Sequence, residues 1–87
     1  MSYTVVWVPA AEQELAELWL NAAQRREVTE AAREIDSRLR FSPAEQGESR
    51  PRGRRILLVL PLGVTFEILP EDRIVRVLDV WRFEKRG

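Results

Sequence analysis

The stretch RRILLVLPLGVTFEILPEDRIVRVLDVWRF, residues 54–83, contains three runs of apolar and β-branched residues, separated by two short links that each begin with proline. β-Branched and aromatic residues favour strands, so strands are predicted over Arg54–Leu60, Val64–Leu69 and Arg73–Phe83. Links this short join antiparallel neighbours. We therefore predict a three-stranded antiparallel meander. Apolar residues on both faces of its last strand predict an interior position.

One strand and two helices are predicted before the meander. Tyr3–Val8 has strand composition, and the proline that follows suits the first turn of a helix predicted over Ala10–Asn21. A second amphipathic helix is predicted over Arg25–Arg40. The tight connection between the two predicts an antiparallel helical hairpin. Phe41–Gly53, with two prolines, two glycines and two serines, is predicted to be a loop.

The element order β-α-α-β-β-β predicts an α+β fold, in which a two-helix hairpin packs on a mostly antiparallel four-stranded sheet. With 87 residues, the chain is expected to be a single domain spanning 1–87. Both helices are expected on one face of the sheet. The opposite face is then left for a function or for a partner.

Composition excludes several classes of chemistry. The chain has neither cysteine nor histidine, so disulfides, thiolate nucleophiles, zinc fingers and histidine-based triads are excluded. We expect no cofactor and no metal. The sequence shows neither a basic leader nor an apolar stretch of membrane-spanning length, which predicts a cytoplasmic protein.

Positive and negative charges balance over the chain but not along it. Fourteen basic residues, all but one of them arginine, match fourteen acidic ones. Residues 12–36 are predominantly acidic, whereas residues 38–55 carry six arginines against two glutamates. Arginine suits planar contacts with phosphate or carboxylate. These arginines could form an anion-attracting edge or could simply be solvated and ion-paired.

Three segments together resemble a known family: PAAEQELAELW after an extended start, the basic strand RRILLVLPLGVTFEIL, and RIVRVLDVWRFEKRG. The chain resembles the RelE/ParE superfamily of bacterial type II toxin–antitoxin toxins, also called plasmid stabilisation proteins. The resemblance covers nearly the whole chain and rests on element order and apolar pattern. It implies a compact toxin that a cognate antitoxin wraps with a disordered tail.

The resemblance implies two activities and leaves a third role open. RelE-like toxins are endoribonucleases that cleave mRNA on the ribosome, whereas ParE-like toxins poison DNA gyrase without nuclease activity. An attenuated, non-catalytic interaction module of the same fold is the third reading. The expected partners are therefore an antitoxin and either the ribosome with its mRNA or gyrase.

The resemblance also assigns candidate site residues for RNA cleavage. Cleavage without metal requires a base, an acid and cations that stabilise the transition state. Arg55 on the basic strand and Arg82 near the C-terminus match the family's catalytic arginine regions. The remaining candidates would bind RNA phosphates: Arg50, Arg52, Arg54, Lys85 and Arg86.

The sequence departs from the nuclease pattern at several positions. Trp81 and Phe83 stand where a tyrosine or histidine would be expected, and the only tyrosine is Tyr3. Either aromatic residue could stack a base or could pack in the fold. Asp79 is predicted to pair with an arginine such as Arg76. The net charge of zero disfavours an RNA-directed toxin.

Overall fold

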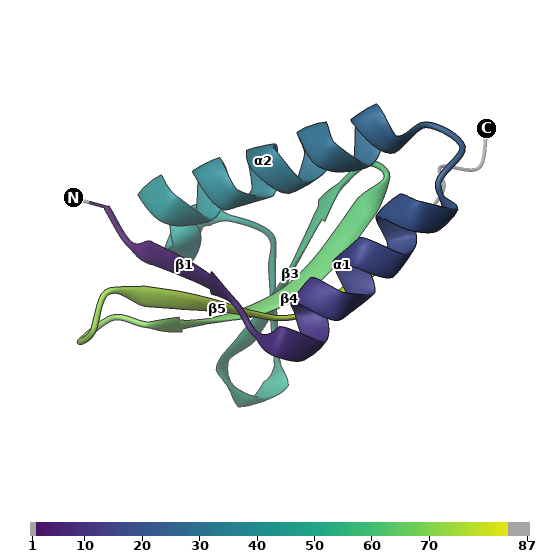
Figure 1. Cartoon of the computed structure of the whole chain (residues 1–87). Helices are drawn as coiled ribbons and strands as arrows, with labels where there is room; N and C mark the ends of the chain where they lie inside the picture. Colours follow the sequence, from purple (N-terminus) through teal and green to yellow (C-terminus); the bar gives the residue numbers. More distant parts are fainter. Residues whose placement is uncertain (1, 84–87) are drawn as a thin grey trace.

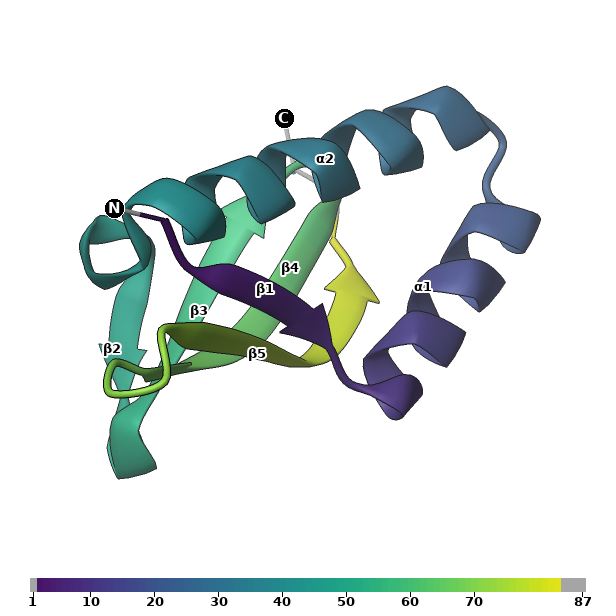
Figure 2. The same ribbon diagram turned by 60° about the vertical axis from the view of Figure 1, so that its left-hand side comes forward.

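The computed structural model describes residues 2–83, which form two helices and a five-stranded sheet (Figures 1 and 2). The elements are β1 (Thr4–Trp7), α1 (Pro9–Asn21), α2 (Arg25–Phe41), β2 (Glu48–Arg50), β3 (Arg54–Val59), β4 (Leu62–Leu69) and β5 (Ile74–Arg82), with short 3₁₀ turns at Pro43–Glu45 and Pro51–Gly53. Neither helix in this part of the chain is long and apolar enough to cross a membrane.

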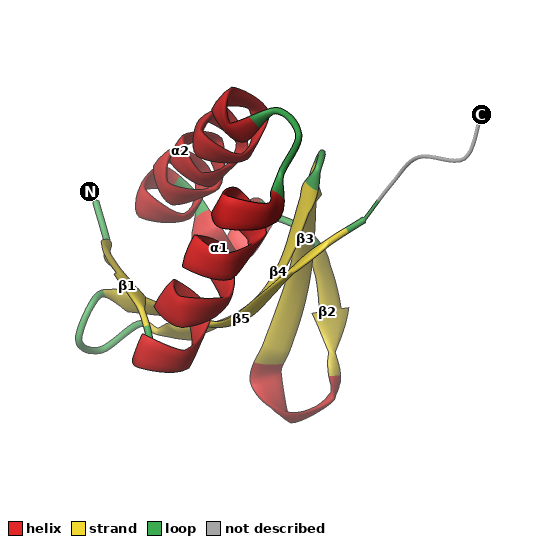
Figure 3. Cartoon of the chain, turned by 45° about the vertical axis from the view of Figure 1, so that its right-hand side comes forward, coloured by secondary structure: helices red, strands yellow, loops and turns green. Residues whose placement is uncertain are grey.

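The strands lie in the order β1-β5-β4-β3-β2. β1 runs parallel to β5, and every other neighbouring pair is antiparallel. This confirms the α+β class, the meander of β3, β4 and β5, and the interior position of β5. Both helices lie on the same side of the sheet (Figure 3).

The number of strands differs from the prediction, because β2 forms inside the segment Phe41–Gly53 that was expected to be a loop. β2 pairs with the start of β3 through a turn at Pro51–Gly53. Arg52 and Gly53 both have positive φ in this turn, at 66° and 72°. The left-handed conformation is readily adopted by glycine. A proline–x–glycine turn therefore closes a hairpin where composition alone indicated a loop.

The core lies between α2 and the face of the sheet beneath it, which we call the helix-side face. Val64 and Phe66 of β4 and Val77 of β5 are fully buried there, and they are joined by Ile35 and Leu39 of α2. Alternate residues of a strand point to opposite faces, so one set of positions on each strand supplies the core. The apolar stripe of the second helix, at Val28, Ala32, Ile35 and Leu39, packs in this contact, with Ala32 partly buried and the other three buried.

The helical hairpin is more open than predicted. Figure 2 shows α1 and α2 diverging from their connection, and a groove of about 750 Å³ lies between them. α1 lies along the part of β5 that extends beyond the end of β1. There the carboxylate of Glu14 accepts a hydrogen bond from the Val80 amide at 3.3 Å. Glu14 thus satisfies a sheet amide that has no further strand beside it.

A β-bulge divides β5 into two parts. Phe66 pairs with Val77 but Thr65 pairs with Asp79, so Leu78 is the extra residue on β5. A bulge shifts the alternation of side chains by one position. Beyond it, Val80 returns to the core and Trp81 points to the opposite face of the sheet. Strict alternation along β5 without the bulge would place Trp81 on the same face as Val77.

Candidate binding surface on the open sheet face

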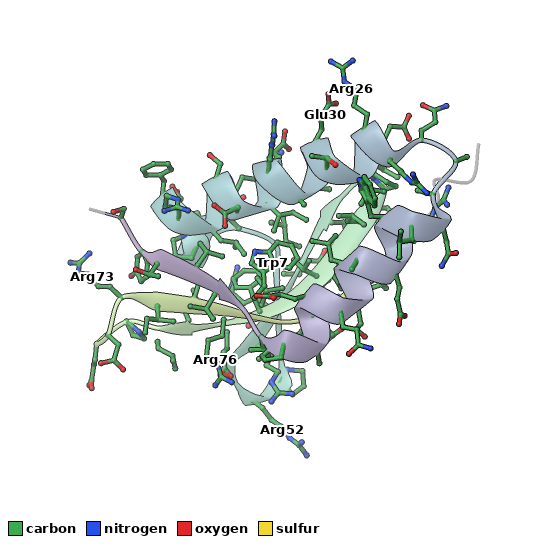
Figure 4. All side chains as sticks on the ribbon, viewed as in Figure 1. Trp7, Arg26, Glu30, Arg52, Arg73 and Arg76 are labelled. Carbon is green, nitrogen blue, oxygen red and sulfur yellow. The ribbon has the colours of Figure 1, made fainter. Side chains whose placement is uncertain are left out.

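The face of the sheet turned away from the helices, called here the open face, carries the charged and exposed strand residues. Strand register and alternation assign its members. They are Thr4 and Val6 of β1, Glu48 and Arg50 of β2, Arg54, Ile56 and Leu58 of β3, Gly63, Thr65, Glu67 and Leu69 of β4, and Ile74, Arg76, Asp79 and Trp81 of β5. Figure 4 shows Arg76 projecting from the side of the sheet opposite α2.

A row of charged residues crosses the open face from β2 to β5. The register places Arg50 opposite Arg54, Arg54 opposite Glu67, and Glu67 opposite Arg76. Arg76 Nη1 lies 3.6 Å from Glu67 Oε2, and Arg50 Nη2 lies 3.1 Å from Glu48 Oε2. Two of the three arginines in the row are therefore ion-paired within the same face.

Beyond the pair of Thr65 and Asp79, the open face becomes apolar. Trp81 lies directly over Gly63, where a Cβ atom would come within 2.6 Å of the indole ring. Only glycine leaves room for this ring, so the pairing of Gly63 with Trp81 creates a flat aromatic platform. Leu58, on the other side of Gly63, is 53% exposed. The open face therefore combines an ion-paired half with an apolar half.

Arg55, one of the two predicted catalytic residues, lies on the other face of β3 from Arg54. Its Nε donates to the Gln46 carbonyl at 2.9 Å, and its Nη2 donates to the Gly47 carbonyl at 3.2 Å. Two donors of a half-buried guanidinium are thus used to hold the chain that leads into β2. The geometry gives Arg55 a structural role, and its catalytic role stays a prediction.

The structure does not bring the two predicted catalytic residues together. Arg55 pairs across the sheet with Phe66 and Arg82 with Leu62, on opposite sides of β4. These positions on β4 are four residues, or roughly 13 Å, apart. Arg82 is exposed at the end of β5, on the strand face opposite to that of Trp81.

The predicted phosphate-binding residues are also dispersed. Arg50 and Arg54 are neighbours on the open face, whereas Arg52 is exposed at the tip of the β2–β3 turn (Figure 4). Lys85 and Arg86 lie outside the described residues.

Tyr3 and Asp79 each have a side-chain contact of their own within the described residues. Tyr3 precedes β1, and the guanidinium of Arg73 lies 5.9 Å from its ring centroid, at the far end of β5 from Trp81. Asp79 accepts a hydrogen bond from the Thr65 hydroxyl at 3.4 Å. The predicted pairing of Asp79 with Arg76 is wrong, because alternation and the bulge place Arg76 beside Glu67.

Glu48, Leu58, Glu67 and Arg76 of the open face were not among the candidate site residues predicted from the sequence. The signal that could have found Arg76 and Glu67 is their position on predicted adjacent strands. Using it requires the register, which the sequence did not supply.

With the geometry in place, comparison with known proteins identifies the fold. No family model and no curated protein matches this sequence. Solved structures do match. The toxin–antitoxin complex RelBE2 from Mycobacterium tuberculosis has 20% identity and a TM-score of 0.79, covering 94% of this chain and 92% of that chain. The chromosomal ParDE toxin–antitoxin system from P. aeruginosa has 16% identity and a TM-score of 0.66, covering 94% and 97%. A mutant of the E. coli toxin RelE in the free state has 15% identity and a TM-score of 0.73, covering 94% and 84%.

These likenesses define the fold of the chain. The chain has the α+β fold of the RelE and ParE toxins, and the resemblance noted in its sequence is confirmed at that level. The same fold is shared by both groups, so the activity has to be argued from the surface.

Proposed function

We propose that this chain is the toxin component of a type II toxin–antitoxin pair, neutralised by a cognate antitoxin protein. Two observations support the proposal. The fold is shared with structures of the RelBE2 and ParDE pairs along almost their whole matched chains. The open face is also a broad surface without a covering layer in residues 2–83, as a protein that acts on a macromolecular target requires.

We further propose that the chain acts by binding a protein target, as the ParE-like reading implies, and not by cleaving mRNA. The observation that carries this choice is the charge balance of the open face, where Arg50 lies beside Glu48 and Arg76 beside Glu67. A surface that binds a polyanion needs uncompensated positive charge. With Asp79, the open face carries three acids against three arginines. Such a mosaic fits a protein surface of mixed charge.

Cleavage of mRNA is the second candidate, and the Trp81 platform is the observation in its favour. A flat indole supported by Gly63 could stack a nucleobase, a contact that contributes roughly 1–3 kcal/mol. Arg54 lies opposite Arg50 and Glu67 on the neighbouring strands, and it would supply a phosphate contact.

Induced expression without an antitoxin tests the function. Growth arrest that a co-expressed neighbouring open reading frame reverses would support the toxin proposal, and unimpaired growth would contradict it. Primer extension on a translated mRNA separates the two candidates. Arrest without new 5′ ends is expected for a binding toxin. New 5′ ends inside codons, lost in Arg82→Ala and Trp81→Ala but kept in the matched control Arg26→Ala, would establish cleavage instead.

A further inference from the structure

The turn between β3 and β4 is the most exposed apolar part of the sheet. Leu58, near the end of β3, is 53% exposed, and Leu60, in the turn that follows, is 52% exposed. Leu58 belongs to the open face and Leu60 to the turn, so two exposed leucines flank this end of the sheet, and exposed apolar side chains are found where proteins meet. The turn lies close to the first half of α2 (Figures 1 and 3).

A groove separates this turn from α2. It has a volume of about 490 Å³, and we call it the turn groove. Leu60 and Pro61 form its sheet side, and Glu27, Glu30 and Glu34 lie on its helix side. One wall is therefore apolar and the other is acidic.

The ion pairs of the acidic wall leave its carboxylates able to bind a cation from another molecule. Glu30 pairs with Arg26 on the outer surface of α2 (Figure 4), and Glu34 pairs with Arg38, both at helical i,i+4 spacing. Exposed pairs of this kind are weak and readily exchanged. The arginines themselves are not among the residues that line the groove.

The charge of the groove decides what it can hold. The residues that line it include three glutamates and no arginine or lysine, which disfavours an RNA backbone or an acidic peptide and favours a cationic segment. We propose that the turn groove docks a segment of a partner protein in which apolar side chains alternate with lysine or arginine. The apolar side chains contact Leu60 and Pro61, and the cations contact Glu27 and Glu34 of α2. The docking of such a segment stands by itself. The identification of its protein as the toxin's target rests on the proposed function.

Peptide binding to the purified chain tests the docking site. The probe is a fluorescein-labelled peptide of alternating lysine and leucine, compared with a glutamate–leucine peptide of equal length and with an oligouridine. The test variants are Leu60→Ser and the double variant Glu27→Gln/Glu34→Gln. The matched controls are Phe41→Ser, at a residue with 63% exposure outside the groove, and Glu45→Gln/Glu71→Gln, which changes the net charge equally.

The lysine–leucine peptide is expected to bind saturably, and each test variant is expected to weaken its Kd by about fivefold or more, as loss of a central interface contact does. The controls should leave the Kd unchanged. The proposal is overturned if the controls weaken binding as much as the test variants, or if no saturable binding occurs. It is also overturned if the oligouridine or the acidic peptide binds with the same dependence on Leu60.

Growth arrest provides a separate readout. If both proposals hold, Leu60→Ser abolishes arrest and Phe41→Ser does not. If the toxin proposal alone fails, the wild-type chain causes no arrest but still binds the peptide through Leu60. If the docking proposal alone fails, arrest occurs and Leu60→Ser leaves it unchanged.

Discussion

The helix-side and open faces are built from the same strands but have opposite properties. On β4, Val64 and Phe66 are fully buried beneath α2, whereas the neighbouring Thr65 and Glu67 hold polar contacts with β5 on the open face. Because strand side chains alternate, a single strand contributes to stability through one set of positions and to recognition through the other. Substitutions on the two faces should therefore affect stability and binding separately.

The largest effect is expected on the helix-side face. Phe66→Ala removes a fully buried aromatic ring and should lower the free energy of unfolding by about 3–5 kcal/mol. Leu58→Ala, at an exposed site on the next strand, should change it by less than about 1 kcal/mol. Urea unfolding followed by circular dichroism measures both. Similar losses for the two variants would contradict the division between the faces.

Gly63→Ala tests the open face separately from the core, because it introduces a steric conflict on the open face. The new Cβ would lie 2.6 Å from the Trp81 ring, so a loss of about 1–3 kcal/mol in unfolding free energy is expected. The conflict should vanish when the ring is absent. Gly63→Ala/Trp81→Ala should therefore be as stable as Trp81→Ala alone, and a full additional loss in the double variant would exclude this contact as the cause.

Arg54 and Arg55 are adjacent in sequence but lie on opposite faces of β3, so substitutions at these two positions compare the faces directly. Arg55→Ala removes two hydrogen bonds to the carbonyls of Gln46 and Gly47, so a loss of about 1.5 kcal/mol in unfolding free energy is expected. Arg54→Ala, at an exposed position, should cost less than about 0.5 kcal/mol. Chemical denaturation of both variants provides the test. A larger loss from Arg54→Ala would reverse the assigned roles.

The smallest effect is expected for the ion pair between Arg76 and Glu67. The side chains are 44% and 22% exposed, and their closest charged atoms are 3.6 Å apart. A double-mutant cycle with Arg76→Ala and Glu67→Ala should give a coupling energy of about 0.2–1 kcal/mol that decreases in high salt. A coupling that salt does not alter would mean that the contact is not chiefly electrostatic.

Much of the fold could be predicted because local patterns and tertiary packing agree. The helix over 25–40 was correctly predicted because Val28, Ile35 and Leu39 recur at helical spacing. β2 was missed because a strand of three exposed residues, Glu48–Arg50, has no apolar alternation to detect. The candidate surface was less predictable. It depends on which residues face each other across strands, and the bulge at Leu78 changes that relation within β5.

The sequence by itself determined the order and type of the main elements, since apolar periodicity and turn residues act over a few neighbouring positions. It also excluded cysteine and histidine chemistry. Only the tertiary structure placed Arg55 against the Gln46 and Gly47 carbonyls, paired Arg76 with Glu67, and seated Trp81 on Gly63. Those contacts join different strands, or a strand and the loop beside it, and a shift of one residue in strand register would send each side chain to the other face.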